Sequence, residues 1–147
     1  MPLAVREQIL AALFARLGDR LGLRGDGQDD VPLRRNPSAA QEQLTAVDLY
    51  DGGHDIEVGS TTRDSAYILG AELELFAPDG PAFNELYARV RAAIDLDRTF
   101  GGLANNAKER SLTQPSPGTT AGHPDVLGAV LTLDVEFWTR DDDVRAQ

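Results

Sequence analysis

Residues 128–140 (GAVLTLDVEFWTR) most constrain the fold, because they form the longest regular alternation of apolar and polar residues in the chain. Strand side chains point alternately to opposite faces, so an extended chain buries one set and exposes the other. Residues 69–77 (LGAELELFA) repeat the pattern. Both stretches are predicted to be half-buried strands of one sheet. The expected inward residues are Leu69, Ala71, Leu73, Leu75, Leu131, Leu133, Val135 and Phe137.

Length and composition narrow the classes of function. A chain of 147 residues is expected to fold as one domain, 1–147, with a substantial core. It has no cysteine, which excludes disulfides and thiolate metal sites. The net charge of −10 argues against binding to nucleic acid or anionic lipid, since both need a basic face. No apolar run is long enough to span a membrane, and no secretory signal is recognised at the N-terminus.

Two segments have the apolar spacing of amphipathic helices. The first covers residues 3–17, with Gly18 or Gly22 available to end it. The second begins at Asp79 or Gly80, before Pro81, and is expected to end near residues 96–98.

Four shorter segments are predicted to be strands: residues 31–36 at a sheet edge, 44–50, 54–60, and the polar segment 103–113. Asp51, Gly52 and Gly53 read as the turn of a hairpin between the second and third of these. The predicted fold class is therefore α+β, a single domain. It has a mostly antiparallel sheet of four to six strands, with two amphipathic helices packed on one face.

Two segments are expected to lack regular structure. Residues 114–125 (QPSPGTTAGHPD) contain three prolines and two glycines, which predicts a long flexible loop with no element of its own. Such loops are commonly binding loops or are ordered by a partner. Residues 141–147 are predicted to be an acidic C-terminal tail that frays.

Asp51, His54 and Asp55 lie close enough in sequence to suggest a metal site or an acid–base cluster. However, turn chemistry accounts for Asp51, and strand alternation places His54 and Asp55 on opposite faces. Ser60, His54 and Asp48 could form a triad on paper, but no nucleophile elbow accompanies them. No catalytic, cofactor or metal site is predicted, and a small cytoplasmic enzyme or metal-binding protein using the first three residues is kept as an alternative.

The outward side of the two long strands is acidic, with an aromatic residue near the end of each strand. Like charges across a sheet repel each other, and exposed aromatic residues beside charges indicate a contact surface. The two interpretations are a solvated surface and an interface or channel lining, with an adjacent arginine pair as a candidate partner for the acids. The candidate channel-facing or interface acids are Glu72, Glu74, Asp134 and Glu136, and the candidate subunit or partner interface residues are Arg34, Arg35, Phe76 and Trp138.

Taken in order, the segments LAVREQILAALFARL, LTAVDLYDGG, AYILGAELELFAP, FNELYARVRAAIDLDRTFGGLA and GAVLTLDVEFWTR cover most of the chain. In this order the chain resembles the tail-terminator (tail-completion) proteins of long non-contractile phage tails and gene transfer agents. The loop 114–125 departs from many members of that family in length and proline content.

The resemblance implies a structural virion protein and not an enzyme. It implies a ring, as a homohexamer, that ends tube polymerisation at the head-proximal end of the tail. The implied partners are further copies of the chain, the major tail tube protein and the head–tail connector or stopper protein, with DNA passing through unbound and no membrane contact. The implied location is the head–tail junction of a phage or phage-like particle assembled in the host cytoplasm. The alternative within the same particle is a neck or connector-stopper protein.

Overall fold

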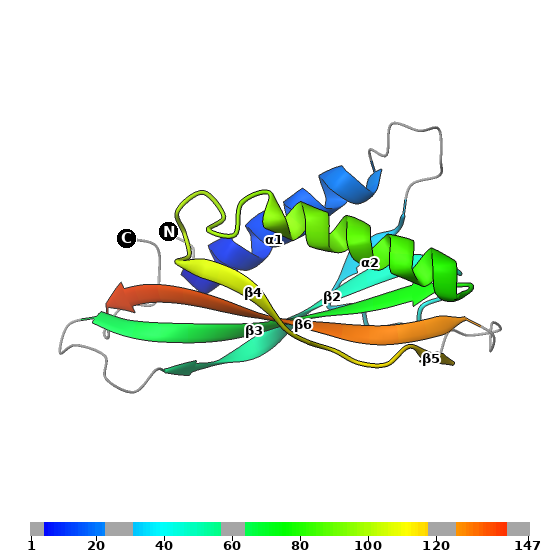
Figure 1. Ribbon diagram of the computed structural model, residues 1–147. Helices are drawn as coiled ribbons and strands as arrows, with labels where there is room; N and C mark the ends of the chain where they lie inside the picture. Colours follow the sequence, from blue (N-terminus) through cyan, green and yellow to red (C-terminus); the bar gives the residue numbers. More distant parts are fainter. Residues whose placement is uncertain (1–4, 23–30, 57–63, 118–125, 141–147) are drawn as a thin grey trace.

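The computed structural model describes residues 5–22, 31–56, 64–117 and 126–140. These residues form two helices and six strands in a single α+β domain (Figure 1), which confirms the predicted fold class. The elements are α1 (Val5–Gly22), β1 (Leu33–Arg35), β2 (Ala46–Ile56), β3 (Asp64–Ala77), α2 (Gly80–Asp95), β4 (Asn106–Leu112), β5 (Ser116–Pro117) and β6 (Leu127–Arg140).

The strands form one sheet in the order β1-β2-β3-β6-β4, and the short β5 pairs with β6. The β1–β2 pair is parallel and the other pairs are antiparallel. Figure 1 shows α1 and α2 together on one face of this sheet. Within the described residues, no helix is both long and apolar enough to cross a membrane.

The two alternating segments form the centre of the sheet, as predicted. β3 and β6 pair along their whole lengths, with Ala71 opposite Leu133 and Leu73 opposite Leu131. The eight residues expected to point inward are all buried. Burial contributes about 1.5–3 kcal/mol for each large side chain, so the hydrophobic side of β6 is a major part of the stability of the fold.

Both helices begin and end close to their predicted positions. α1 runs through Gly18 and ends at Gly22, and α2 ends at Asp95. The Asp79 side chain caps α2 by accepting a hydrogen bond from the Ala82 N–H at 2.8 Å, as expected for an N-cap aspartate. The buried stripe of α2 consists of Phe83, Leu86, Val90, Ala93 and Ile94.

The predicted hairpin around residues 51–53 is wrong, because β2 is one continuous strand. Asp51 lies opposite Ala71 and His54 opposite Leu69, so β2 has one residue more than β3 between these two pairs. This is a β-bulge, and two consecutive glycines accommodate it without ending the strand. The sequence by itself also fits a turn here, because glycine is favoured both in turns and in β-bulges.

The prediction that residues 114–125 form no element also needs correction, since Ser116–Pro117 pairs with β6 as β5. Residues 118–125 and the predicted tail, 141–147, lie outside the described residues, as does Ser60.

The turn after α2 contains the D-R-T-F-G-G-L sequence that contributes to the family resemblance. The Asp97 carboxylate accepts hydrogen bonds from the Thr99 hydroxyl at 2.6 Å and from the Gly101 and Thr99 N–H groups at 2.8 and 2.9 Å. These bonds, led by the Thr99 hydroxyl, lower the pKa of Asp97 to about 2. Arg16 of α1 donates to the Asp97 carbonyl at 2.6 Å and lies over the Phe100 ring, which fixes the turn against the first helix.

Candidate functional site

The candidate site is the outer face, defined as the side of the sheet opposite α1 and α2. It consists of the residues of β3 and β6 that alternate with the buried ones, together with their neighbours on β2 and β4. Its central residues are Ile68, Gly70, Glu72 and Glu74 of β3, and Val130, Thr132, Asp134, Glu136 and Trp138 of β6.

The four predicted acids share this face, but their register keeps them apart. Glu72 lies opposite Thr132, and Glu74 lies opposite Val130. On β6, Asp134 lies opposite Gly70 and Glu136 opposite Ile68. No two of these carboxylates are direct cross-strand neighbours, so the repulsion expected from the sequence is reduced.

Strand β4 supplies cations to the β6 acids. Arg110 lies 3.8 Å from Asp134, and Lys108 lies 4.0 Å from Glu136. Arg110 and Lys108 are well exposed, and exposed ion pairs of this kind contribute about 0–1 kcal/mol. These pairs are therefore too weak to prevent the acids from contacting another molecule.

The β3 acids have different surroundings. Partial burial, together with the nearby carboxylate of Asp48, raises the pKa of Glu74. Glu72 is exposed, and no ion pair to it is found within the described residues.

Arg34 lies on the outer face and is engaged within the chain. Its guanidinium donates two hydrogen bonds to Asp48, at 2.9 and 2.8 Å, and this raises the pKa of Arg34. Asp48 is only 1% exposed and also accepts a hydrogen bond from the Gln41 amide at 3.0 Å. A buried carboxylate needs such partners, so this arginine has a structural task whatever else it contacts.

Arg35 points to the other face, because consecutive strand residues alternate. It donates hydrogen bonds to Glu7 of α1 and to Asp51 of β2, at distances between 2.8 and 3.0 Å. These bonds lower the pKa of both carboxyl groups. The adjacent arginine pair is thus divided between the two faces of the sheet, and both members are bonded to acids of their own chain.

The two aromatic residues differ sharply. The expectation that Phe76 is exposed is wrong: it is 3% exposed and packs with Ala46 and Val126. Ala46 is its cross-strand partner on β2, and Val126 comes from the segment that leads into β6. Trp138, in contrast, is 45% exposed.

The residues considered for a metal or acid–base site do not converge. His54 Nδ1 accepts a hydrogen bond from Arg6 at 3.0 Å, on the side of α1, and the His54 ring meets Tyr67 edge-on. Asp51 accepts hydrogen bonds from Arg35, whereas Asp55 lies on the outer face, opposite Ile68 of β3. Among the described residues, no group of three or more histidine or acidic side chains could hold a metal ion. Of the catalytic triad considered from the sequence, the two described members lie apart: Asp48 is on the outer face, bonded to Arg34, whereas His54 is on the side of α1.

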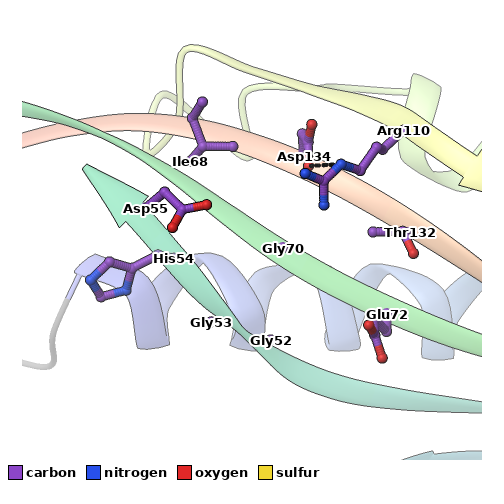
Figure 2. Close-up of a pocket in the computed structure, with 10 residues that line it drawn as sticks. All are labelled: Gly52, Gly53, His54, Asp55, Ile68, Gly70, Glu72, Arg110, Thr132 and Asp134. Atoms are coloured by element: carbon purple, nitrogen blue, oxygen red, sulfur yellow. Dashed lines mark ion pairs between the residues drawn. The ribbon is translucent and has the colours of Figure 1, made fainter. Parts of the chain in front are cut away.

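Sequence reasoning missed a hollow in the middle of the outer face (Figure 2). Its volume is about 270 Å³, and its floor is made by Gly52, Gly53 and Gly70. Arg110 lies at its edge, and Figure 2 shows the ion pair between Arg110 and Asp134. Gly70, an isolated glycine in an otherwise regular strand pattern, was the signal that could have indicated it.

The fold and the site together define an α+β domain that buries one sheet face under two helices and presents an acidic opposite face. No protein-family model matches the chain, and no match is found among curated proteins.

Three solved structures that are similar to the chain all have low identity and a TM-score below 0.5. One, a protein without a descriptive name, is 17% identical with a TM-score of 0.48, covering 89% of this chain and 95% of that one. Another is the sheath/tube terminator of an extracellular contractile injection system (PVC) in the extended state. It is 12% identical with a TM-score of 0.45, covering 95% of this chain and 59% of that one. The third is a chain of the virion of a native gene transfer agent particle. It is 14% identical with a TM-score of 0.36, covering 92% of each chain.

Proposed function

We propose that this protein is a structural subunit of a phage tail or of a phage-like particle such as a gene transfer agent. In this proposal, copies of the chain form a ring, most simply a hexamer, at the head-proximal end of the tail tube. The ring ends tube polymerisation and joins the tail to the head connector, and the protein is not an enzyme. The sequence resemblance supports this role, and the resembling segments correspond to α1, β2, β3, α2 with its following turn, and β6.

The observation that carries the proposal is the outer face of the sheet. The inward side chains of β3 and β6 are almost completely buried, so the domain has a well-packed core. Its outward side chains include four acids that are at least partly exposed and an exposed tryptophan. The exposed tryptophan suits contact with another protein subunit, because aromatic residues are enriched at interfaces, and the acids suit the wall of a passage for DNA, because they repel phosphates.

The charge of the chain fits a passage for DNA. A net charge of −10 gives the duplex no basic path to bind, so phosphates are repelled and the DNA is free to slide. We expect duplex DNA to show no saturable binding to the purified protein in a gel shift at about 50 mM salt, where electrostatic attraction would be strong. A micromolar dissociation constant under these conditions would overturn the passage model.

The role in assembly is tested by imaging particles made without this gene. Overlong tails are the expected result, because tube growth would lack its stop. Tails of normal length without heads would instead assign the chain to the connector. Normal, infectious particles would refute a structural role in the particle.

The use of the outer face is tested by a double charge reversal, Asp134→Lys with Glu136→Lys. Failed ring assembly on tail tubes would place this end of the face at a subunit boundary, whereas normal rings with slowed DNA ejection would place it in the passage. Asp19→Lys on α1 is the matched control, because Asp19 is exposed on the helical side of the domain. Equal effects of the reversal and the control would show that the outer face has no special role.

A further inference from the structure

The hollow in the outer face is lined by glycine residues at its base and by charged side chains around its sides. Gly52 and Gly53 belong to the bulge of β2, and Gly70 lies beside them on β3. Around this floor stand the carboxylates of three acidic residues and one guanidinium. The charged wall residues are Asp55, Glu72, Asp134 and Arg110.

Gly53 and Gly70 leave space in the hollow, although neither the packing nor the backbone conformation at these two positions requires glycine. A Cβ at Gly52 would collide with the backbone of Gly70, so that position requires glycine. A Cβ at Gly53 would meet nothing within 4 Å, and one at Gly70 would meet only the Gly53 carbonyl, at an ordinary 3.7 Å. Neither has a positive φ. Glycine weakens a strand interior, and where the fold does not need it, it often marks the close approach of a ligand or of another backbone.

Among the described residues, the walls carry more negative than positive charge. Arg110 is 63% exposed, and its Nε lies 3.8 Å from Asp134, too far for a hydrogen bond. Within the described part of the chain, no ion pair to Asp55 or Glu72 is found. Three carboxylates therefore face one loosely held guanidinium. The excess of carboxylates makes the hollow complementary in charge to a cationic group.

We propose that the hollow receives an arginine side chain from an adjoining protein subunit, whose backbone lies against Gly53 and Gly70. A planar guanidinium can bond two carboxylates at once, and arginine is enriched at protein interfaces. Arg110 lies beside Asp134 at the edge of the hollow (Figure 2), so the hollow itself stays open to a second guanidinium. The inference rests on the proposed function only in taking the adjoining subunit to be another protein of the particle.

The test is an NMR titration of the isolated protein with the tripeptide acetyl-Gly-Arg-Gly-amide. Its citrulline analogue, which has nearly the same shape without the charge, serves as the matched ligand. Saturable shifts of the Gly53 and Gly70 amide signals are expected with the arginine peptide and not with the citrulline peptide. Equal shifts with both peptides, or shifts confined to α1 and α2, would overturn the proposal.

Protein variants make the test specific. Glu72→Gln is expected to weaken binding of the arginine peptide at least fivefold, since it removes one carboxylate from the wall. Gly70→Val is expected to abolish binding by filling the hollow, while the circular dichroism spectrum stays that of the folded protein. Asp19→Asn on α1 is the control and should leave the affinity unchanged. Unchanged affinity in Glu72→Gln would refute the proposal, and because no tail assembly is involved, this failure is distinct from failure of the proposed function.

Discussion

Replacing Gly52 by alanine should destabilise the protein far more than the same change at the neighbouring glycines. A Cβ at position 52 would lie 1.6 Å from the Gly70 carbonyl oxygen and 2.6 Å from its carbonyl carbon, whereas ordinary contact begins at about 3.4 Å. The two strands would have to separate by about 1.8 Å at the bulge, because both colliding groups are backbone and neither can rotate away. Overpacking costs about 1–3 kcal/mol, and each backbone hydrogen bond lost near the bulge adds about 1 kcal/mol. We therefore expect Gly52→Ala to lower the free energy of unfolding by about 3–5 kcal/mol.

Gly53→Ala and Gly70→Ala are the matched controls. Their added methyl groups meet open space or an ordinary contact, and alanine restricts the unfolded chain, so a change within about 1 kcal/mol of wild type is expected. Urea denaturation followed by far-ultraviolet circular dichroism measures all three variants. At a slope of about 2 kcal/mol per molar urea, the midpoint of Gly52→Ala should fall by about 2 M. A midpoint within about 0.5 M of Gly53→Ala would refute the close-approach argument.

Arg35→Met should lower the free energy of unfolding by about 1–3 kcal/mol at pH 7, because partly exposed Glu7 and Asp51 lose their shared cation. Their pKa values are lowered in the folded state, so this contribution is present above about pH 4.5 and lost as the pH falls through the folded pKa values. The stability gap between wild type and variant should therefore narrow in acid, and a constant gap from pH 7 to pH 3 would contradict this. The carboxyl carbon of Asp97 should titrate by NMR with a pKa of about 2, and a value near 4 would show that the turn does not hold it as described. Phe76→Ala should cost about 3–5 kcal/mol in a urea denaturation experiment, as expected for a buried phenylalanine, and a cost below 1 kcal/mol would restore the idea that it is exposed.

Much of the domain could be predicted from local patterns. The alternation in residues 128–140 and 69–77 predicted two strands, and their pairing as β3 and β6 confirmed that the acids share one face. The cap at Asp79 could also be read directly, because an N-cap residue and a first-turn proline act within one turn of helix. In each case the preference for a strand or for a helix start depends on residues only a few positions apart in the sequence.

The hairpin at residues 51–53 and the exposure of Phe76 were predicted wrongly because both depend on contacts between segments that are distant in sequence. Gly52 and Gly53 favour a turn and a bulge equally well, and the choice depends on the β3 backbone, which follows the strand 46–56 in the chain. Phe76 was expected to be exposed because its strand face is polar, but Val126, about fifty residues further on, packs over it. The intrachain partners of Arg34 and Arg35 come from other elements, so local patterns could not identify them, and the role of these arginines at an interface stays a prediction.

The sequence alone therefore determined the alternating faces, the helix boundaries and the acidic character of the outer face, because periodicity and capping are short-range properties of the chain. Only the tertiary structure decided the bulge, the burial of Phe76 and the division of the arginine pair between the two faces. It also created the hollow, since Gly53 and Gly70 leave space only when β2 and β3 lie side by side, and the sheet brings Arg110 of β4 to the edge of this space. Strand order and register bring these groups together, and they are set by packing over the whole domain rather than by any local sequence preference.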